Sequence, residues 1–540
     1  MIKNAAIFAG VLSAYGLMNL LAAVMTSVAL LHIYIYNRHW FMRPSLMVAG
    51  LMNLFFQWPL AVYAGYYAEW LPHPFDLALV VHLPVLAALL AAALFPDRAL
   101  RDTWARLNPG TGDGGLPVRV WAVILGGLGV LVVLFAGVYF AYVPWRCTGL
   151  HAMLYEFTNV AIYREISLKM LSHALPRYAY SLLSSALLPV FYMFSALLVA
   201  GAIKNGQKSI AALAVFLCML CLPLLMLVGA KGIAVMVLLQ TSLLFFWRAQ
   251  LHATPARLAA IIVLPMLPAF LFMASLALVS QKQGVPLTLD QAYRACNVAL
   301  DSQIIKTPQL IENERIAKEV SLPKKPATAK IDDDSSDISS VSSKPYEDAN
   351  ARHPIKPQAV QDVDTGHLSD AKVIYLNVMA VMFRVFATPL MAGSWHIHYT
   401  QFQGVTGLLG LNAYAHLVAV PYIDIPNRVG LIYGPVYYGH EVINTISVST
   451  GFVFTNYDYL GISSVILSVI MLLLQDLVIL VYRFVSRDIL AAFLAVVSMA
   501  SLRMLQTDVT VVWVSHGYLI SMLLIGAAQT IICFLNRRGG

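Results

Sequence analysis

The stretch SSVILSVIMLLLQDLVILVY (Ser463–Tyr482) decides the class of fold to which this chain belongs. Within it, Asp476 is the single charged side chain. At a rise of about 1.5 Å per residue, a helix of this length crosses the roughly 30 Å hydrocarbon core of a bilayer. The run Ala5–Ile33 has the same apolar character. The sequence therefore predicts helices that span a membrane.

The composition extends this prediction to most of the chain. Of its 540 residues, 59% are hydrophobic and 11% are charged, whereas soluble domains carry about 25% charged residues. The formal net charge of +8 is modest for this length. No basic cluster interleaved with aromatic residues indicates a nucleic-acid partner. We expect an all-α polytopic membrane protein whose surroundings are the lipid bilayer.

Successive apolar runs are the candidate spans, and they predict about 11–12 transmembrane helices. The runs cover residues 5–36, 45–67, 76–95, 119–144, 177–203, 209–229, 231–248, 258–280, 457–482, 488–504 and 510–535. If the spans alternate in direction, six sets of basic residues fall on one side. They are Arg38 and Arg43; Arg98, Arg101, Arg106 and Arg119; Lys204 and Lys208; Arg248 and Arg257; Arg483 and Arg487; and Arg537 and Arg538. Because positive loops face the cytoplasm, the C-terminus is expected inside and the N-terminus outside.

The same alternation divides the chain into four parts. Residues 1–280 form an N-terminal transmembrane bundle with an external loop at 144–176, and residues 457–540 form the C-terminal transmembrane helices. Residues 281–372 are an external, partly disordered insertion, because few of them could bury apolar area. Residues 373–456 form an external loop with the candidate active site. Within it, Val373–Met391 is interpreted first as an amphipathic or re-entrant helix, with a further span as the alternative.

The cysteine pattern gives little sign of cross-links. The five cysteines are Cys147, Cys218, Cys221, Cys296 and Cys533. Three of them lie in or beside apolar runs, which argues against a disulfide framework. Cys218 and Cys221 form a CxxC without a second pair, so we expect small helix residues there rather than a zinc or redox site.

Cationic side chains gather on the predicted external face. The candidates for substrate binding are Arg146, Arg164, Arg177, Lys231, Arg384 and Arg428. Arginine binds phosphate through two parallel hydrogen bonds, and lysine supplies a point charge. Arg384 lies within an apolar run, where a charge is costly unless it is paired or hydrated. The pattern predicts an anionic substrate at the external leaflet; contact with lipid headgroups is the alternative for Arg146 and Arg164.

The stretch NRVGLIYGPVYYGHEV (427–442) combines backbone-turn signals with polar side chains. Gly430, Gly434, Pro435 and Gly439 predict a loop with tight turns rather than a helix. Such a loop lets the backbone approach a ligand closely.

The side chains of this stretch suit a sugar substrate. Tyr433 and Tyr438 offer flat faces for sugar rings and hydroxyls for hydrogen bonds, with an interfacial aromatic belt as the alternative. His440 is the first candidate for a general base, and Glu441 would orient it or take its place.

His396 and His398, in WHIHY, are further candidates for substrate binding and alternatives for the base. Their i, i+2 spacing is typical of a strand and would suit a metal with a third ligand. No third ligand is clearly placed by the sequence, so we expect no metal.

The arrangement of many spans, two polar external loops with arginines and short cytoplasmic connections resembles the Wzy-type O-antigen polymerases of bacterial envelopes. Locally, Arg428-VGLIYGPVYY-Gly439 is similar to the R-x10-G pattern of that family's periplasmic loops. The polar loop that leads into TNYDYLGISSVILSVIMLLL (455–474), with its glycine before a late span, also resembles the family's layout.

This resemblance implies a GT-C-like fold in the bacterial inner membrane, with the active site facing the periplasm. It implies a metal-independent glycosyltransferase that needs no cofactor and polymerises undecaprenyl-pyrophosphate-linked oligosaccharides into an envelope polysaccharide. Arg428, Arg384, Arg177 and Lys231 would bind the pyrophosphate, and His440 or Glu441 would accept the proton of the attacking hydroxyl. A chain-length regulator and a flippase are left open as partners.

Other functions compete with this interpretation. An O-antigen ligase would share the cationic pocket. A transporter or flippase of anionic lipid-linked solutes is disfavoured because no inverted repeat is visible. A glycosyltransferase that uses dolichyl-phosphate sugars is disfavoured because the first external loop, YAEWLPHP, contains the single acid Glu69.

Overall fold

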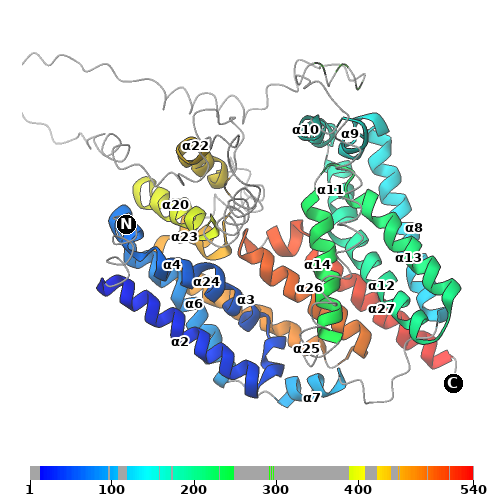
Figure 1. Cartoon of the computed structure of the whole chain (residues 1–540), viewed down its shortest axis with the longest axis horizontal. Helices are drawn as coiled ribbons and strands as arrows, with labels where there is room; N and C mark the ends of the chain where they lie inside the picture. Colours follow the sequence, from blue (N-terminus) through cyan, green and yellow to red (C-terminus); the bar gives the residue numbers. More distant parts are fainter. Residues whose placement is uncertain are drawn as a thin grey trace, which may run out of the picture. The chain divides into compact units, whose positions relative to one another are not determined.

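The computed structural model describes most of the chain as helices (Figure 1). It describes residues 13–94, 98–107, 118–156, 159–171, 174–229, 231–248, 388–407, 423–438, 450–482, 484–509 and 511–538, together with residues 291, 294, 296 and 448. Within these residues no strand occurs, and eight helical segments are long and apolar enough to cross a membrane. The prediction of an all-α polytopic membrane protein is confirmed.

The eight segments match eight of the predicted spans. Five of them lie within a single helix: Ala14–Tyr36 (α2), Pro74–Leu94 (α6), Val120–Tyr142 (within α8, Val118–Tyr142), Lys208–Leu225 (α13) and Tyr518–Leu535 (within α27, Tyr518–Arg538). Pro44–Val62 consists of α3 (Pro44–Met52), η2 (Asn53–Gln57) and α4 (Trp58–Val62), and Leu175–Lys204 lies within α11 (Ala174–Leu182), η5 (Leu183–Leu187) and α12 (Leu188–Lys204). Phe452–Tyr482 consists of α23 (Phe452–Leu460), η8 (Gly461–Ser463), α24 (Ser464–Leu474), η9 (Gln475–Val478) and α25 (Ile479–Tyr482). Two more predicted spans, 231–248 and 488–504, correspond to α14 (Lys231–Arg248) and α26 (Arg487–Met504). The predicted span 258–280 lies outside the described residues.

The remaining elements are short. They are η1 (Arg38–Met42), α5 (Ala64–Trp70), α7 (Arg98–Arg106), η3 (Trp145–Cys147), α9 (Gly149–Tyr155), α10 (Val160–Met170), α20 (Thr388–Gln403), α22 (Ile425–Tyr438) and η10 (Val511–Ser515). The predicted external loop 144–176 contains η3, α9, α10 and the start of α11.

Local sequence explains where the long helices are interrupted. The π-helical turns η2 and η5 each end two residues before a proline, Pro59 and Pro189. A proline ring clashes with the carbonyl four residues earlier, and a wider π turn removes that clash. The predicted span 510–535 is broken before α27, where Gly517 has a φ of 69°, a conformation that favours glycine.

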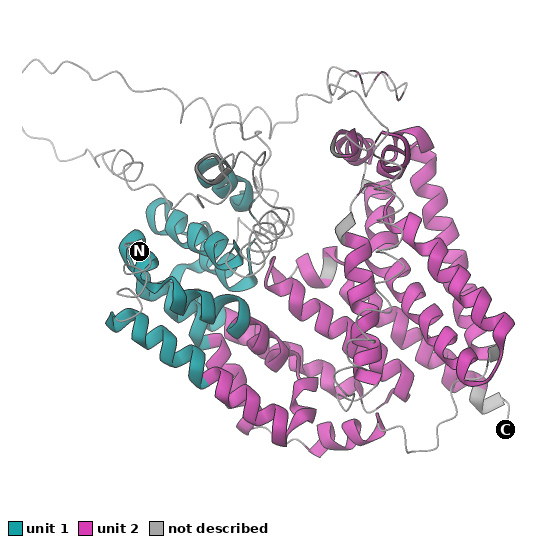
Figure 2. Cartoon of the chain, in the orientation of Figure 1, with its two compact units in different colours: residues 1–25, 53–83, 300–467 teal, residues 26–52, 84–299, 468–540 magenta. Residues whose placement is uncertain are grey.

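The helices belong to two compact units, shown in separate colours in Figure 2. Unit 1 comprises residues 1–25, 53–83 and 300–467, and unit 2 comprises residues 26–52, 84–299 and 468–540. In unit 2, α12 packs against α13, and α14 packs against α26. In unit 1, α20 packs against both α22 and α23. The candidate site described below lies in unit 1.

A carboxylate from the C-terminal part of the chain caps α3 in unit 2. The backbone N–H of Ser45 donates to Oδ1 of Asp476 at 3.0 Å, and its hydroxyl donates to Oδ2 at 2.7 Å. The guanidinium of Arg43 lies 3.8 Å from the same carboxylate. A negative charge at a helix N-terminus is favourable. Asp476, the single charge within Ser463–Tyr482, is therefore paired.

A disulfide joins Cys147 to Cys296 in unit 2. The sequence-based expectation that the cysteines form no disulfide framework is thus wrong for this pair. Both cysteines lie in segments that are predicted to be external, 144–176 and 281–372. Cys147 is buried, and its carbonyl accepts a hydrogen bond of 2.6 Å from the hydroxyl of Ser167 on α10.

Helix α9 begins where two backbones touch, which makes Gly149 sensitive to substitution. A Cβ at Gly149 would lie 2.3 Å from backbone atoms of Val228 and Gly229. Because backbone rather than a flexible side chain would have to move, Gly149→Ala is expected to lower the free energy of unfolding by about 1–3 kcal/mol. Thermal unfolding of the protein in detergent measures this effect. Gly137→Ala, whose Cβ would meet no atom of the described residues within 4 Å, is the control and should leave Tm unchanged or slightly raised.

Candidate functional site

Helix α22 covers most of the stretch that the sequence assigned to a loop. The prediction of tight turns, based on Gly430, Gly434 and Pro435, is wrong as far as Tyr438, because these residues lie inside the helix. The remainder of the stretch, from Gly439 onward, lies outside the described residues.

Two signals in the sequence explain α22. Ile425, Val429 and Ile432 recur at helical spacing, and they pack into the hydrophobic core cluster of unit 1. Oδ1 of Asp424 accepts a hydrogen bond of 3.1 Å from the backbone N–H of Asn427, which caps the helix N-terminus. Burial of this apolar face outweighs the low helix propensity of the glycines.

WHIHY lies in α20, so the strand-like interpretation of its spacing is also wrong. On a helix, residues two positions apart point to nearly opposite sides. His396 therefore shares a face with Thr400, whereas His398 shares a face with Phe402. The two histidines have different surroundings and can have different roles.

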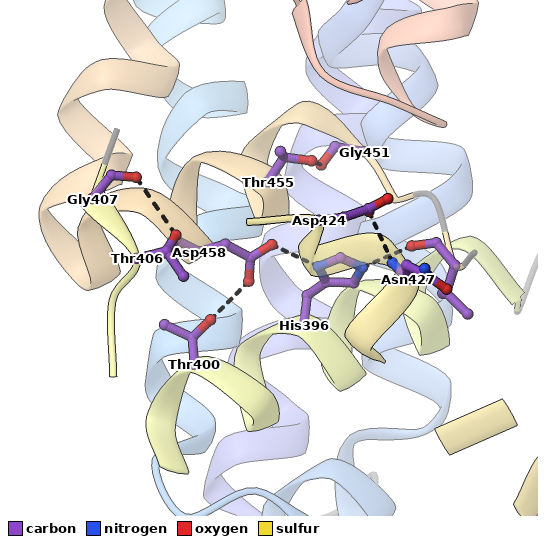
Figure 3. Close-up of polar contacts among 10 residues, drawn as sticks. His396, Thr400, Thr406, Gly407, Asp424, Asn427, Gly451, Thr455 and Asp458 are labelled. Atoms are coloured by element: carbon purple, nitrogen blue, oxygen red, sulfur yellow. Dashed lines mark hydrogen bonds and ion pairs between the residues drawn. The ribbon is translucent and has the colours of Figure 1, made fainter. Parts of the chain in front are cut away.

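His396 is the centre of a buried hydrogen-bond network (Figure 3). Its Nδ1 lies 2.6 Å from Oδ2 of Asp458 on α23, and the two side chains are 0% and 1% exposed. Its Nε2 lies 2.9 Å from the carbonyl oxygen of Val448. The hydroxyl of Thr400 donates to Oδ1 of Asp458 at 2.7 Å, and the backbone N–H of Thr406 donates to the carbonyl oxygen of Asp458 at 3.0 Å. The network ties α20, α23 and two connecting segments together.

The pKa of His396 is raised above its ordinary value. Burial by itself lowers the pKa, but the charge of Asp458 and the hydrogen bonds to Asp458 and Val448 raise it by more. A protonated imidazole donates from both nitrogens, and both of its partners here are acceptors. The arrangement is that of an imidazolium paired with a carboxylate.

His398 lies on the other side of α20, among aromatic rings. Its Nδ1 is 2.6 Å from the hydroxyl of Tyr433 on α22. The ring of Trp70, at the end of α5, stacks on the imidazole with a centroid distance of 4.6 Å and an interplanar angle of 9°. Trp395 stacks on Tyr433 at 5.8 Å. Phe402 lies 4.6 Å from the imidazole centroid. These contacts fix the orientation of the His398 ring.

Burial lowers the pKa of His398 to about 4, so the imidazole is neutral near pH 7. One nitrogen of a neutral imidazole carries a lone pair. Among the described residues, Nε2 of His398 has no hydrogen-bond partner, and the side chain is half-buried. If Nδ1 donates to Tyr433, Nε2 can accept a proton from a bound hydroxyl. An oriented, neutral histidine with one open nitrogen has the geometry of a general base.

Four of the predicted site residues lie on two packed helices of unit 1. Arg428 and Tyr433 lie on α22, and His396 and His398 lie on the adjoining α20. Arg428 is half-buried, and no carboxylate among the described residues pairs with its guanidinium. Tyr438 ends α22, but its side chain is not described.

The other predicted site residues belong to unit 2 or lie outside the described residues. Arg146 on η3, Arg164 on α10 and Arg177 on α11 are exposed. Lys231 begins α14, without a described side chain. Arg384, His440 and Glu441 lie outside the described residues.

Sequence reasoning missed two carboxylates of unit 1. Asp458 lies at the start of the predicted late span, and Asp76 lies in the first turn of α6. A carboxylate within an apolar run is costly unless it is paired, and that signal could have identified Asp458. Its partner His396 is 62 residues away in the sequence, so only the fold shows the pair.

No protein-family model, curated protein or solved structure matches this chain.

Proposed function

We propose that this protein is a membrane glycosyltransferase that polymerises lipid-pyrophosphate-linked oligosaccharides. The observation that carries the proposal is the oriented, neutral imidazole of His398 on α20, next to the helix that carries Arg428 and Tyr433. A base, a cation and aromatic rings are the groups that transfer of a sugar from a pyrophosphate requires.

The proposed reaction uses these residues in sequence. His398 accepts the proton of a hydroxyl on the acceptor sugar, and the hydroxyl oxygen attacks the anomeric carbon of the donor chain. The bond between that carbon and the pyrophosphate oxygen breaks, and the lipid pyrophosphate leaves with the electron pair. Arg428 stabilises the negative charge of the leaving group. His440 and Glu441 stay candidates for the base on the sequence pattern.

The disulfide supports the proposal that the external segments lie on the periplasmic side of the membrane. Cys147 and Cys296 both lie in segments that the distribution of basic residues places outside the cytoplasm. Disulfides persist in oxidising compartments such as the bacterial periplasm and are rare in the cytosol. The charge distribution and the cross-link are independent observations, and both favour a periplasmic position for the external segments of an inner-membrane protein.

Chain extension by the purified protein in nanodiscs tests the proposal. With synthetic undecaprenyl-pyrophosphate-linked repeat units and EDTA present, wild type is expected to produce a ladder of products. Arg428→Ala should slow extension by roughly 10²–10³-fold, because a donor to the developing charge is lost. Lys204→Ala, which removes an exposed cation at the end of α12, should extend chains like wild type.

The other outcomes separate the competing functions. Transfer to an added lipid A core acceptor without a ladder would identify a ligase. Absence of both products, with the wild-type protein folded, would overturn the proposal and favour transport. Equal extension by wild type and Arg428→Ala would remove Arg428 from the anion site.

A further inference from the structure

A second group of polar side chains lies in unit 1, one turn of α20 beyond His398. It consists of Gln401 on α20, Asp76 in the first turn of α6, and Tyr457 on α23. The proposed reaction as described so far uses none of them. They meet beside the turn between α5 and α6, and Trp70, the last residue of α5, stacks on His398.

The contacts orient the carboxylate of Asp76 and leave part of it open. The Tyr457 hydroxyl donates to Oδ2 of Asp76 at 2.5 Å, and Nε2 of Gln401 donates to the same oxygen at 3.2 Å. Nε2 of Gln401 also lies 3.2 Å from the carbonyl oxygen of His73. Among the described residues, Oδ1 of Asp76 accepts no hydrogen bond, and the residue is partly exposed.

Gln401 adds a second acceptor without a donor. Its Oε1 is buried and has no hydrogen-bond partner in the part of the chain that the structure describes. Buried polar atoms are nearly always paired, and each exception calls for an explanation. The hydroxyl groups of a bound sugar can donate to Oδ1 of Asp76, and a small rotation of the Gln401 side chain would expose its Oε1 to the same sugar.

An apolar surface borders these acceptors. The Phe402 side chain, next to Gln401, is 46% exposed, and its ring also contacts His398. A carboxylate, an amide and an exposed aromatic ring supply the hydrogen bonds and the flat apolar face that carbohydrate recognition needs.

We propose that Asp76, Gln401 and Phe402 form the subsite for the acceptor sugar and that this sugar is a neutral pyranose. This inference rests on the proposed function. His398 and Gln401 are three residues apart on one helix face, so their Cβ atoms are roughly 5–6 Å apart, about the width of a sugar ring. One pyranose can thus hydrogen-bond to Asp76 while it presents another hydroxyl to His398. A uronic acid is disfavoured, because a carboxylate placed next to that of Asp76 is repelled.

Direct binding of methyl pyranosides tests the subsite without any turnover. Saturation-transfer NMR on the full chain in nanodiscs would compare methyl glycosides of hexoses, 6-deoxyhexoses and N-acetylhexosamines with those of uronic acids. Wild type is expected to bind at least one neutral pyranoside and no uronide. Asp76→Asn, which keeps the shape of the side chain, should weaken binding by roughly tenfold or more, because the hydrogen bond to a charged acceptor is lost.

Two further variants separate recognition from folding. Phe402→Ala changes an exposed ring and should also weaken binding while Tm is retained. Glu69→Gln, an exposed acid on the neighbouring α5, is the matched control and should bind like wild type. Failure of every neutral pyranoside to bind, or equal binding by wild type and Asp76→Asn, would overturn the inference.

The binding and extension experiments fail independently. A ladder from wild type without Asp76-dependent binding would leave the polymerase standing and overturn the subsite. Asp76-dependent binding without a ladder or transfer would establish the sugar subsite and overturn the proposed reaction.

Discussion

Replacement of Asp458 by alanine is expected to lower the free energy of unfolding by about 2–4 kcal/mol, because it removes the counter-charge that keeps His396 protonated and leaves the buried Nδ1 of the imidazole without its partner. The substitution also removes the acceptor of the Thr400 hydroxyl. Since α20 packs on α23 through this network, the loss should loosen unit 1 as a whole. Thermal and denaturant unfolding in detergent micelles would measure the effect.

Two comparisons make this prediction specific. Thr400→Val removes one hydrogen bond and is expected to cost about 1 kcal/mol. Asp102→Ala, an exposed acid on α7, should change the stability by less than about 0.5 kcal/mol. A stability of Asp458→Ala equal to that of the Asp102 control would show that the pair contributes nothing.

The same pair gives the stability a defined dependence on pH. The pKa of His396 is raised in the folded protein relative to about 6.5 in the unfolded chain. The stabilisation from its charged form is therefore fully present below pH 6.5 and is lost as the pH rises through the raised value. In wild type, Tm should fall over this range more steeply than in His396→Gln, where the titrating group is absent.

Replacement of His398 by alanine is expected to slow chain extension by about 10²-fold, the lower end of what a positioned general base contributes, because a pKa of about 4 makes the imidazole a weak base. The substitution leaves the buried pair of His396 intact, so Tm should change far less than for Asp458→Ala. Extension rates with the same lipid-linked repeat units as above would measure the loss. His32→Ala on α2, which removes an exposed imidazole, is the control and should leave the rate unchanged.

The pH profile distinguishes a base from a structural histidine. Because burial lowers the pKa of His398 to about 4, the imidazole remains neutral through the mildly acidic range. Wild-type extension should be constant from pH 8 to about pH 5 and should fall as the pH approaches 4. Tyr433→Phe removes the hydrogen bond to Nδ1 and is expected to move this lower limit. A rate that does not respond to either His398→Ala or Tyr433→Phe would exclude the role.

The membrane class and most of the spans could be predicted, because an apolar run long enough for a bilayer is a local property of the sequence. The interruptions before Pro59 and Pro189 are also local, although apolar runs alone do not show them. For α22, the glycines and Pro435 indicated turns, while the apolar stripe of Ile425, Val429 and Ile432 indicated a helix. The stripe prevails because it is buried against residues of α20, which the sequence does not reveal.

The parts of the site that could not be predicted from the sequence depend on contacts between residues that are far apart in the chain. His396 and Asp458 are 62 residues apart, and Gln401 lies 325 residues from Asp76. The disulfide joins cysteines separated by 149 residues. A residue's type and its neighbours suggested that His396 and His398 were important, but only the helix geometry of α20 assigns them to opposite sides with different partners.

The capping of α3 by Asp476 has a consequence for biosynthesis. Ser45 and Asp476 are 431 residues apart, so at about 5–20 residues per second the ribosome needs roughly 20–90 s to deliver the carboxylate after the helix has emerged. During that interval the second span has been made without its distant cap. A chain truncated before Ser464 would lack this carboxylate, so a C-terminal deletion would also leave α3, in the N-terminal part of the chain, without its cap.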